Sequence, residues 1–277
     1  MDPTGPENQS LSVPATDRSF LYGDGVFETL LVVNGVALWR DLHEDRMALG
    51  AKRLGIEVEM EDVRQAIQDG AQRSLATAGV LRVTVSRSST ERGYAPSVNA
   101  GARITATHSA LARDPFVPLP AANISTSSIV MGDQPLLAGI KHCNRLEQVL
   151  AAAEAIERGV DDVVLCNAAD VYQCSSNANL FVLRGDGLLT SPCERSGVLG
   201  TRRRLIIDSL AGRLGLSVRE VPLKHEDLSS ADGMFLCNSI MGIRRVARWE
   251  HRVFEPNDVL NRLQCTYYEE ARQCSAM

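Results

Sequence analysis

The chain has 277 residues, of which 44% are hydrophobic and 23% are charged, a composition typical of soluble globular proteins. The formal net charge is −5 and the basic residues are scattered, which argues against a nucleic-acid partner. No stretch approaches the roughly 20 apolar residues of a membrane span, and the polar N-terminus does not resemble a secretion signal. We therefore expect a cytoplasmic protein with reduced cysteines.

The first predicted elements are a hairpin and a helix. Phe27–Val33 is strand-like, Asn34–Gly35 is a two-residue turn signal, and Val36–Trp39 returns as a second strand. Asp41 is placed to cap a following amphipathic helix, and Gly55 supplies a stop signal for it.

A proline-rich segment then divides the chain. The hydrophobic spacing before it predicts a helix over Val63–Ala78 and strands over Val80–Ser86 and Ala102–His108. Residues Ala112–Ala121 hold three prolines within six positions, which disfavours both helix and central strand. We therefore predict a smaller N-terminal domain over residues 1–111, a linker over residues 112–121 and a larger C-terminal domain over residues 122–277.

The second half of the chain alternates strands and helices irregularly. The predicted elements are a strand (Asn123–Val130), a helix (Arg145–Glu157), a hairpin-like pair (Asp162–Cys166 and Ala178–Leu183), a helix from about Leu199 to Leu214, further strands and a last helix after Pro256. Hairpins mixed with helices indicate two α/β or α+β domains rather than a doubly wound parallel sheet.

Lys141 is the first candidate for chemistry. It follows an apolar, glycine-containing run and precedes a helical pattern, a position at which most lysines are solvated. However, His142, Asn144 and Arg145 crowd polar groups around it. A lysine amine can act near neutral pH when it is desolvated or lies beside another cation.

Two glycine-bearing turns, Ser196–Arg202 and Asn238–Ile243, are candidates for anion binding. Free backbone N–H groups at a helix N-terminus beside Thr201 would form a phosphate cradle, although many such turns are only helix caps. Arg46, which lies near His43 on the first helix, could supply a cation, but it could equally be a solvated helix residue.

Six ordered blocks cover nearly the whole chain. They are Tyr22–Gly35 (YGDGVFETLLVVNG), Asp41–Ile56, Ser86–Pro96 (SRSSTERGYAP), Ala138–Ala151 (AGIKHCNRLEQVLA), Ala178–Arg204 and Asp232–Val246. Together they resemble the class IV aminotransferases, which are fold-type IV pyridoxal-phosphate enzymes of the D-amino-acid aminotransferase kind. The KHxNRLE run, the ERGY turn and the FLCNS segment look most like the aminodeoxychorismate lyases within that class.

The resemblance implies roles for particular residues and a homodimer whose interface borders the site. Lys141 matches the lysine that holds pyridoxal 5'-phosphate and later moves the proton at the substrate carbon. Arg92 and Tyr94 match residues on the substrate side, where a cation suits a dicarboxylate. The residues that match the phosphate site are Arg46, Val198, Leu199, Gly200, Thr201, Asn238 and Ser239.

The chain departs from the family pattern at one position. The family carries a glutamate before its Asn-Leu-Phe motif, whose carboxylate keeps the pyridine nitrogen of the cofactor protonated. Here that position falls on Cys174 without gaps, or on Gln173 with one inserted residue. Neither can supply the negative charge. This leaves three interpretations: an active variant with a weaker electron sink, a homologue with different chemistry, or one that has lost activity.

The implied reaction converts 4-amino-4-deoxychorismate to 4-aminobenzoate, a folate precursor, and pyruvate. Aromatisation supplies a driving force that amino transfer lacks, so a weak electron sink suits this elimination better. The alternatives are an aminotransferase acting on D-amino or branched-chain acids, and a non-catalytic homologue.

Overall fold

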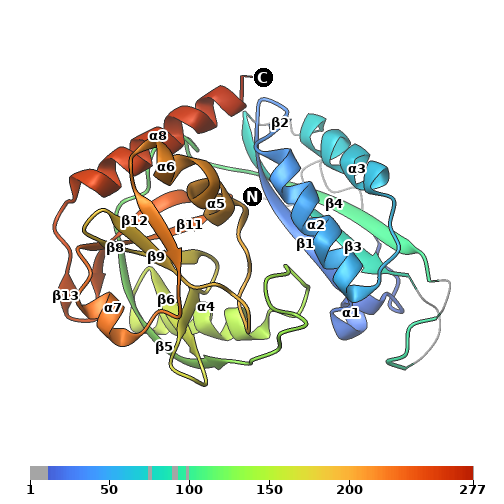
Figure 1. Cartoon of the computed structure of the whole chain (residues 1–277). Helices are drawn as coiled ribbons and strands as arrows, with labels where there is room; N and C mark the ends of the chain where they lie inside the picture. Colours follow the sequence, from blue (N-terminus) through green and yellow to red (C-terminus); the bar gives the residue numbers. More distant parts are fainter. Residues whose placement is uncertain (1–11, 74–76, 89–92, 98–99, 277) are drawn as a thin grey trace.

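The computed structural model describes residues 12–73, 77–88, 93–97 and 100–276, which form two β-sheets covered by helices (Figure 1). The smaller sheet is antiparallel, with the strand order β2-β1-β3-β4. Its strands are β1 (Gly25–Val33), β2 (Val36–Ala37), β3 (Ala78–Arg87) and β4 (Ala102–Ala110). A short helix, α1 (Arg18–Tyr22), precedes it, and α2 (Arg40–Leu54) and α3 (Met60–Gln72) share a hydrophobic core with it.

Local sequence signals explain where these elements turn and stop. Asn34 and Gly35 have positive φ angles of 50° and 80°, so the predicted hairpin turn is confirmed. Gly55 ends α2 in the left-handed conformation, as predicted. The predicted cap at Asp41 was wrong, because Asp41 lies inside the first turn and Trp39, at φ 51°, flanks the helix without a side-chain cap.

Two predicted boundaries in this part were also wrong. The strand after the turn ends at Ala37 rather than Trp39. The helix predicted to reach Ala78 ends at Gln72, and Ala78 already begins β3. The reason is tertiary, because β3 pairs with β1 along its length, from Ala78 opposite Val33 to Ser86 opposite Gly25. These ladder hydrogen bonds outweigh a local helical pattern.

The larger sheet has nine strands. They are β5 (Ala122–Met131), β6 (Asp162–Asn167), β7 (Tyr172–Ser175), β8 (Asn179–Arg184), β9 (Gly187–Thr190), β10 (Ser217–Glu220), β11 (Gly233–Asn238), β12 (Gly242–Trp249) and β13 (Arg252–Val253). The order is β10-β9-β8-β11-β12-β5-β6-β7, with β13 beside β12. A further pairing of β7 with β8 closes six of these strands into a ring.

The hairpin predicted between residues 162–166 and 178–183 was wrong. β6 pairs with β7 instead, and β7 meets β8 through the single pair Cys174 and Asn179. The short strand Tyr172–Ser175 carries too little apolar patterning to be recognised from sequence. As a result, β7 places Cys174 at the point where the ring closes.

Helices surround the larger sheet. They are α4 (Leu146–Arg158), α5 (Thr201–Leu205), the π-helical segment η1 (Ile206–Leu210), α6 (Ala211–Arg213), α7 (His225–Ser229) and α8 (Asp258–Cys274). The segments α5, η1 and α6 follow without a break, so they match the helix predicted from about residue 199 to 214, and α8 confirms the predicted last helix.

The two sheets are connected by residues 111–121, which form neither helix nor strand. The C-terminal helix α8 returns to the smaller sheet, where Ala271 packs with Leu31, Val33 and Leu38 (Figure 1). Whether the two parts are separate domains stays a prediction. The seven cysteines are free thiols, and no helix in the described ranges is long and apolar enough to cross a membrane.

Candidate active site

A pocket of about 650 Å³ lies where the two sheets approach each other, within the size range of small-molecule sites. Its walls come from both parts of the chain. The residues used below that line it are Phe27, Thr29, Arg46, Arg113, Lys141, Arg145, Cys174, Asn179, Val198, Gly200, Thr201, Asn238, Ser239 and Arg244. The pocket therefore brings together most of the residues singled out from the sequence.

Lys141 lies in an extended segment that runs beside the start of β1. Its carbonyl accepts a hydrogen bond from the Phe27 N–H at 2.9 Å, and its Nζ lies 4.4 Å from the centre of the Phe27 ring. Burial and the positive charge of Arg46 lower the pKa of the Lys141 amine to about 7, against the opposing effect of Glu28. A large fraction of this amine is therefore uncharged at neutral pH.

Arg46 points toward the glycine-bearing turn but is already paired. Its Nε and Nη2 donate to the two carboxylate oxygens of Glu28 at 2.7 and 2.6 Å, and its Nη1 donates to the Leu199 carbonyl at 3.1 Å. Burial alone would raise the pKa of Glu28, but Arg46 and His43 outweigh it and hold that pKa at about 2. Glu28 was not singled out from the sequence, although a carboxylate inside the apolar run FETLLVV signals a buried partner.

His43 extends this network to Thr201. Its Nδ1 lies 2.5 Å from a Glu28 carboxylate oxygen, and its Nε2 lies 3.5 Å from the Thr201 hydroxyl. Burial lowers the pKa of His43 to about 4, despite the raising effect of Glu28. The ring is therefore neutral at pH 7, with its proton on Nδ1 facing the carboxylate and a free acceptor facing Thr201.

The turn before α5 forms part of the pocket wall. Val198, Gly200 and Thr201 line it, and no hydrogen bond from their amides occurs among the described residues. A side chain at Gly200 would place its Cβ 1.9 Å from Asn179 Oδ1, so any other residue there would require the Asn179 side chain to move. Leu199 is different, because its N–H already donates to the Gly139 carbonyl at 3.0 Å.

Asn238 and Ser239 line the same pocket, at the end of β11. The Ser239 hydroxyl donates to the Thr29 carbonyl at 2.6 Å. The Asn238 side-chain oxygen accepts from the amides of Ile240 and Met241, so this side chain shapes its own turn. Both side chains border the cradle, but their polar groups already have protein partners.

The structure distinguishes Gln173 from Cys174. Gln173 is buried, and its Oε1 accepts a hydrogen bond from the Ser191 hydroxyl at 2.7 Å, away from the pocket. Cys174 lines the pocket, and its thiol donates to the buried Met131 sulfur at 3.7 Å. Burial raises the pKa of the Cys174 thiol to about 12, so it is uncharged. No aspartate or glutamate of the described ranges lines the pocket.

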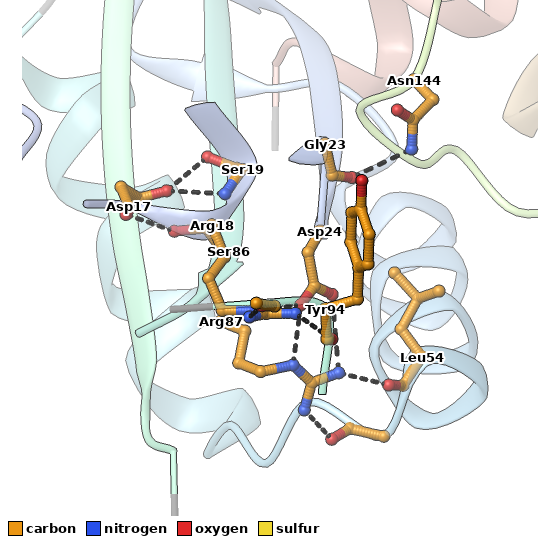
Figure 2. Close-up of polar contacts among 12 residues, drawn as sticks. Asp17, Arg18, Ser19, Gly23, Asp24, Leu54, Ser86, Arg87, Tyr94 and Asn144 are labelled. Carbon is orange, nitrogen blue, oxygen red and sulfur yellow. Dashed lines mark hydrogen bonds and ion pairs between the residues drawn. The ribbon is translucent and has the colours of Figure 1, made fainter. Parts of the chain in front are cut away.

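Of the two substrate-side residues expected from the ERGY turn, Tyr94 does not line this pocket. Arg92 lies outside the described residues. Tyr94 is 85% exposed, and its carbonyl accepts a hydrogen bond from Arg18 Nη2 at 2.7 Å. Figure 2 shows this turn beside Gly23 and Asp24, with Asn144 reaching the Gly23 carbonyl from the Lys141 segment. Arginines that sequence reasoning missed, Arg113 and Arg244, line the pocket instead.

Comparison with known proteins gives one consistent result. A family model described as amino-transferase class IV matches residues 25–249. The aminodeoxychorismate lyase of Vibrio harveyi is 32% identical over 238 residues, which cover 85% of this chain and 86% of that protein. The solved 4-amino-4-deoxychorismate lyase of Pseudomonas aeruginosa superposes with a TM-score of 0.87 at 28% identity, over 95% of this chain and 97% of that one.

A more distant solved relative carries a cofactor. An aminotransferase from Brucella abortus, bound to pyridoxal 5'-phosphate (PLP), superposes with a TM-score of 0.82 at 21% identity, over 96% of this chain and 95% of that one. Likeness at this level of identity establishes a common fold.

Proposed function

This chain belongs to the class IV aminotransferase family, and from that premise we propose that it is a PLP-dependent lyase that converts 4-amino-4-deoxychorismate to 4-aminobenzoate and pyruvate. One observation carries the proposal. The pocket contains Lys141, whose amine has a pKa of about 7, together with several arginines, and no aspartate or glutamate of the described ranges lines it. The similarity to the Vibrio harveyi and Pseudomonas aeruginosa lyases supports it.

The residues present fit the cofactor. The turn at Val198, Gly200 and Thr201 lines the pocket and offers N–H groups without protein partners among the described residues, which suits a phosphate. Arg46 adds a cation at the same turn, and Lys141 offers the amine that would bond the cofactor aldehyde. When bound, PLP supplies an aldehyde for the substrate amine and a conjugated ring that accepts electrons.

Lys141 would have two tasks in this reaction. Its amine would hold the cofactor aldehyde, and as a free amine it would take the proton from the substrate carbon that bears nitrogen. A pKa near 7 suits a group that must both take and return a proton at neutral pH. Loss of that proton and of the neighbouring enolpyruvyl ether leaves an aromatic ring, and return of the proton to the enolpyruvyl methylene gives pyruvate.

The charge of the pocket favours a substrate with carboxylates. Arg113 donates only to backbone carbonyls among the described residues, those of Asp114 and Ile240, and Arg244 is paired with Asp161 at 2.6 Å. Arg113 therefore keeps an uncompensated charge at the pocket wall, and 4-amino-4-deoxychorismate carries two carboxylates that could meet it.

The test is to incubate the PLP-loaded protein with enzymatically prepared 4-amino-4-deoxychorismate and to measure 4-aminobenzoate and pyruvate together. We expect equal amounts of both products, and none from Lys141→Ala. A protein that makes no 4-aminobenzoate but converts D-amino or branched-chain acids to their oxo acids would overturn the proposal in favour of an aminotransferase.

We also propose a homodimer formed through the outer face of α4. Leu146, Val149 and Leu150 lie at helical spacing on one side of this helix and are 77%, 59% and 55% exposed. An apolar stripe of this kind favours contact with a second copy. Because Tyr94 lies outside its own pocket, a substrate-side role for the ERGY turn requires that it reach the pocket of the partner subunit.

A further inference from the structure

The backbone around Lys141 is held from two sides. On one side, β1 pairs with it: the Phe27 N–H donates to the Lys141 carbonyl, and the Cys143 N–H donates to the Gly25 carbonyl, both at 2.9 Å. In extended backbone, successive carbonyls point in opposite directions. The carbonyls before and after Lys141 therefore face away from β1 and need other partners.

Arg145 supplies those partners. Its Nε donates to the His142 carbonyl at 2.9 Å, and its Nη2 donates to the Ile140 carbonyl at 3.1 Å. One planar guanidinium thus bridges the two carbonyls that flank Lys141, in the place where a neighbouring strand would otherwise pair. A lysine could not make this contact with the same geometry, because it lacks the rigid fork.

Arg145 also brings a charge that no described ion pair neutralises, and the nearby Glu147 offsets it only from beyond ion-pair distance. It forms no ion pair with a described carboxylate, whereas two other arginines of the pocket do: Arg46 with Glu28 and Arg244 with Asp161. Burial lowers the pKa of Arg145 only to about 10, so the group is cationic at neutral pH. Cys174, where the family glutamate falls when the sequences are compared without gaps, lines the pocket and carries no charge.

The other charges that act on Lys141 are compensated or screened. Arg46 is paired with Glu28, which acts on the lysine in the opposite sense. Arg82 reaches Lys141 from β3 but is a solvent-exposed residue that lies over the Phe27 ring. Arg145 is the partly buried, unpaired cation among the four groups that influence this amine.

We propose that Arg145 is a positioning residue that fixes the Lys141 segment through the two flanking carbonyls and supplies an uncompensated positive charge beside the Lys141 amine. This keeps the amine uncharged and reactive near neutral pH. The inference rests on the proposed role of Lys141, but its test needs neither substrate nor cofactor.

The test measures the titration of Lys141 directly in the cofactor-free protein. The chain has only three lysines, Lys52, Lys141 and Lys224, so brief acetylation followed by peptide mass spectrometry resolves each of them. The rate of labelling at Lys141 is measured against pH, with the exposed Lys52 as an internal reference. In the parent protein we expect a midpoint near 7.

Arg145→Met removes the charge and should move the Lys141 midpoint up by about 0.5 to 1 pH unit. Arg145→Gln is a second neutral variant, for use if the first does not fold, and its side-chain amide can still donate to a backbone carbonyl. It should also move the Lys141 midpoint up. Arg145→Lys retains the charge and should leave the midpoint near that of the parent. Arg113→Met is the matched control, because it removes a pocket cation that does not contact the Lys141 segment, and the midpoint should not move.

An unchanged Lys141 midpoint in whichever neutral variant folds would overturn the proposal. If the thermal stability of that variant is also lowered, Arg145 is only a structural brace. The protein could instead fail the lyase assay while the Lys141 midpoint is near 7 in the parent and moves up in Arg145→Gln. That result would reject the proposed reaction and support this inference. The two failures are therefore distinguishable.

Discussion

At the scale of single residues, Glu28 determines how Arg46 and His43 behave. Its carboxylate takes two hydrogen bonds from Arg46 and holds the proton of His43 on Nδ1. The Arg46 charge is therefore shared between Glu28 and whatever anion occupies the cradle. The family resemblance implies that Arg46 binds phosphate. Its buried ion pair with Glu28 gives Arg46 a second role, in folding.

The first prediction concerns this pair. Arg46→Ala should reduce the free energy of unfolding by about 3–5 kcal/mol, because it leaves the buried Glu28 carboxylate without its cation. The double variant Glu28→Gln with Arg46→Met should recover most of that stability while still losing affinity for PLP. Thermal unfolding and cofactor titration measure the two effects separately. An Arg46→Ala protein as stable as the parent would show that the pair does not matter for folding.

The second prediction concerns Cys174, which of the two candidates for the family glutamate position is the one that lines the pocket. Cys174→Glu should raise turnover, because a carboxylate there would hold a proton on the pyridine nitrogen and strengthen the electron sink. Arg145, whose charge acts on Cys174, would partner the new carboxylate.

Two variants control this experiment. Cys174→Ser changes the thiol without adding charge and should leave turnover near the parent level. Gln173→Glu should instead lower the thermal midpoint, because its side chain contacts the buried Ser191 away from the pocket. If Cys174→Glu binds PLP normally and turnover does not rise, the weak electron sink is not what limits this enzyme.

At the scale of elements, α4 has two apolar faces with different partners. Ala151 and Ala155 pack against Met131 and the strand β6, which anchors the helix on the larger sheet. The opposite stripe, which begins at Leu146, has no partner within the described chain. Because α4 starts directly after Arg145, a contact on this stripe lies next to the pocket.

The third prediction tests that stripe. The double variant Val149→Glu with Leu150→Glu should be monomeric by analytical ultracentrifugation at concentrations where the parent is a dimer, because two carboxylates cannot be buried in an apolar contact. Val253→Glu, at a 64% exposed apolar position on β13, is the matched control and should remain dimeric. A parent protein that sediments as a monomer would contradict the proposed dimer.

At the scale of the whole molecule, the site combines residues from β1, α2, the Lys141 segment, β7 and the turn before α5. Local signals with a direct mechanism were predictable, such as the Asn34–Gly35 turn and the stop at Gly55. Family blocks indicated Lys141 and the cradle residues, which indeed share one pocket.

What the sequence did not reveal depends on contacts between distant segments. The Leu199 N–H donates to the Gly139 carbonyl, and the Arg145 side chain donates to two backbone carbonyls. No local sequence pattern predicts either hydrogen bond. The choice between Gln173 and Cys174 required the strand register of β7, which a single sequence leaves open. The short β7 was itself missed, because its length and pairing are set by the ring of strands.

The central claim is that Lys141 holds PLP in this pocket, and borohydride reduction of the PLP-loaded protein tests it most directly. Reduction fixes the cofactor to the amine that bears it, and peptide mass spectrometry then identifies the lysine. We expect a single labelled peptide that contains Lys141, and no label in Lys141→Ala. A label on Lys52 or Lys224, or no label from a cofactor-saturated sample, would contradict it.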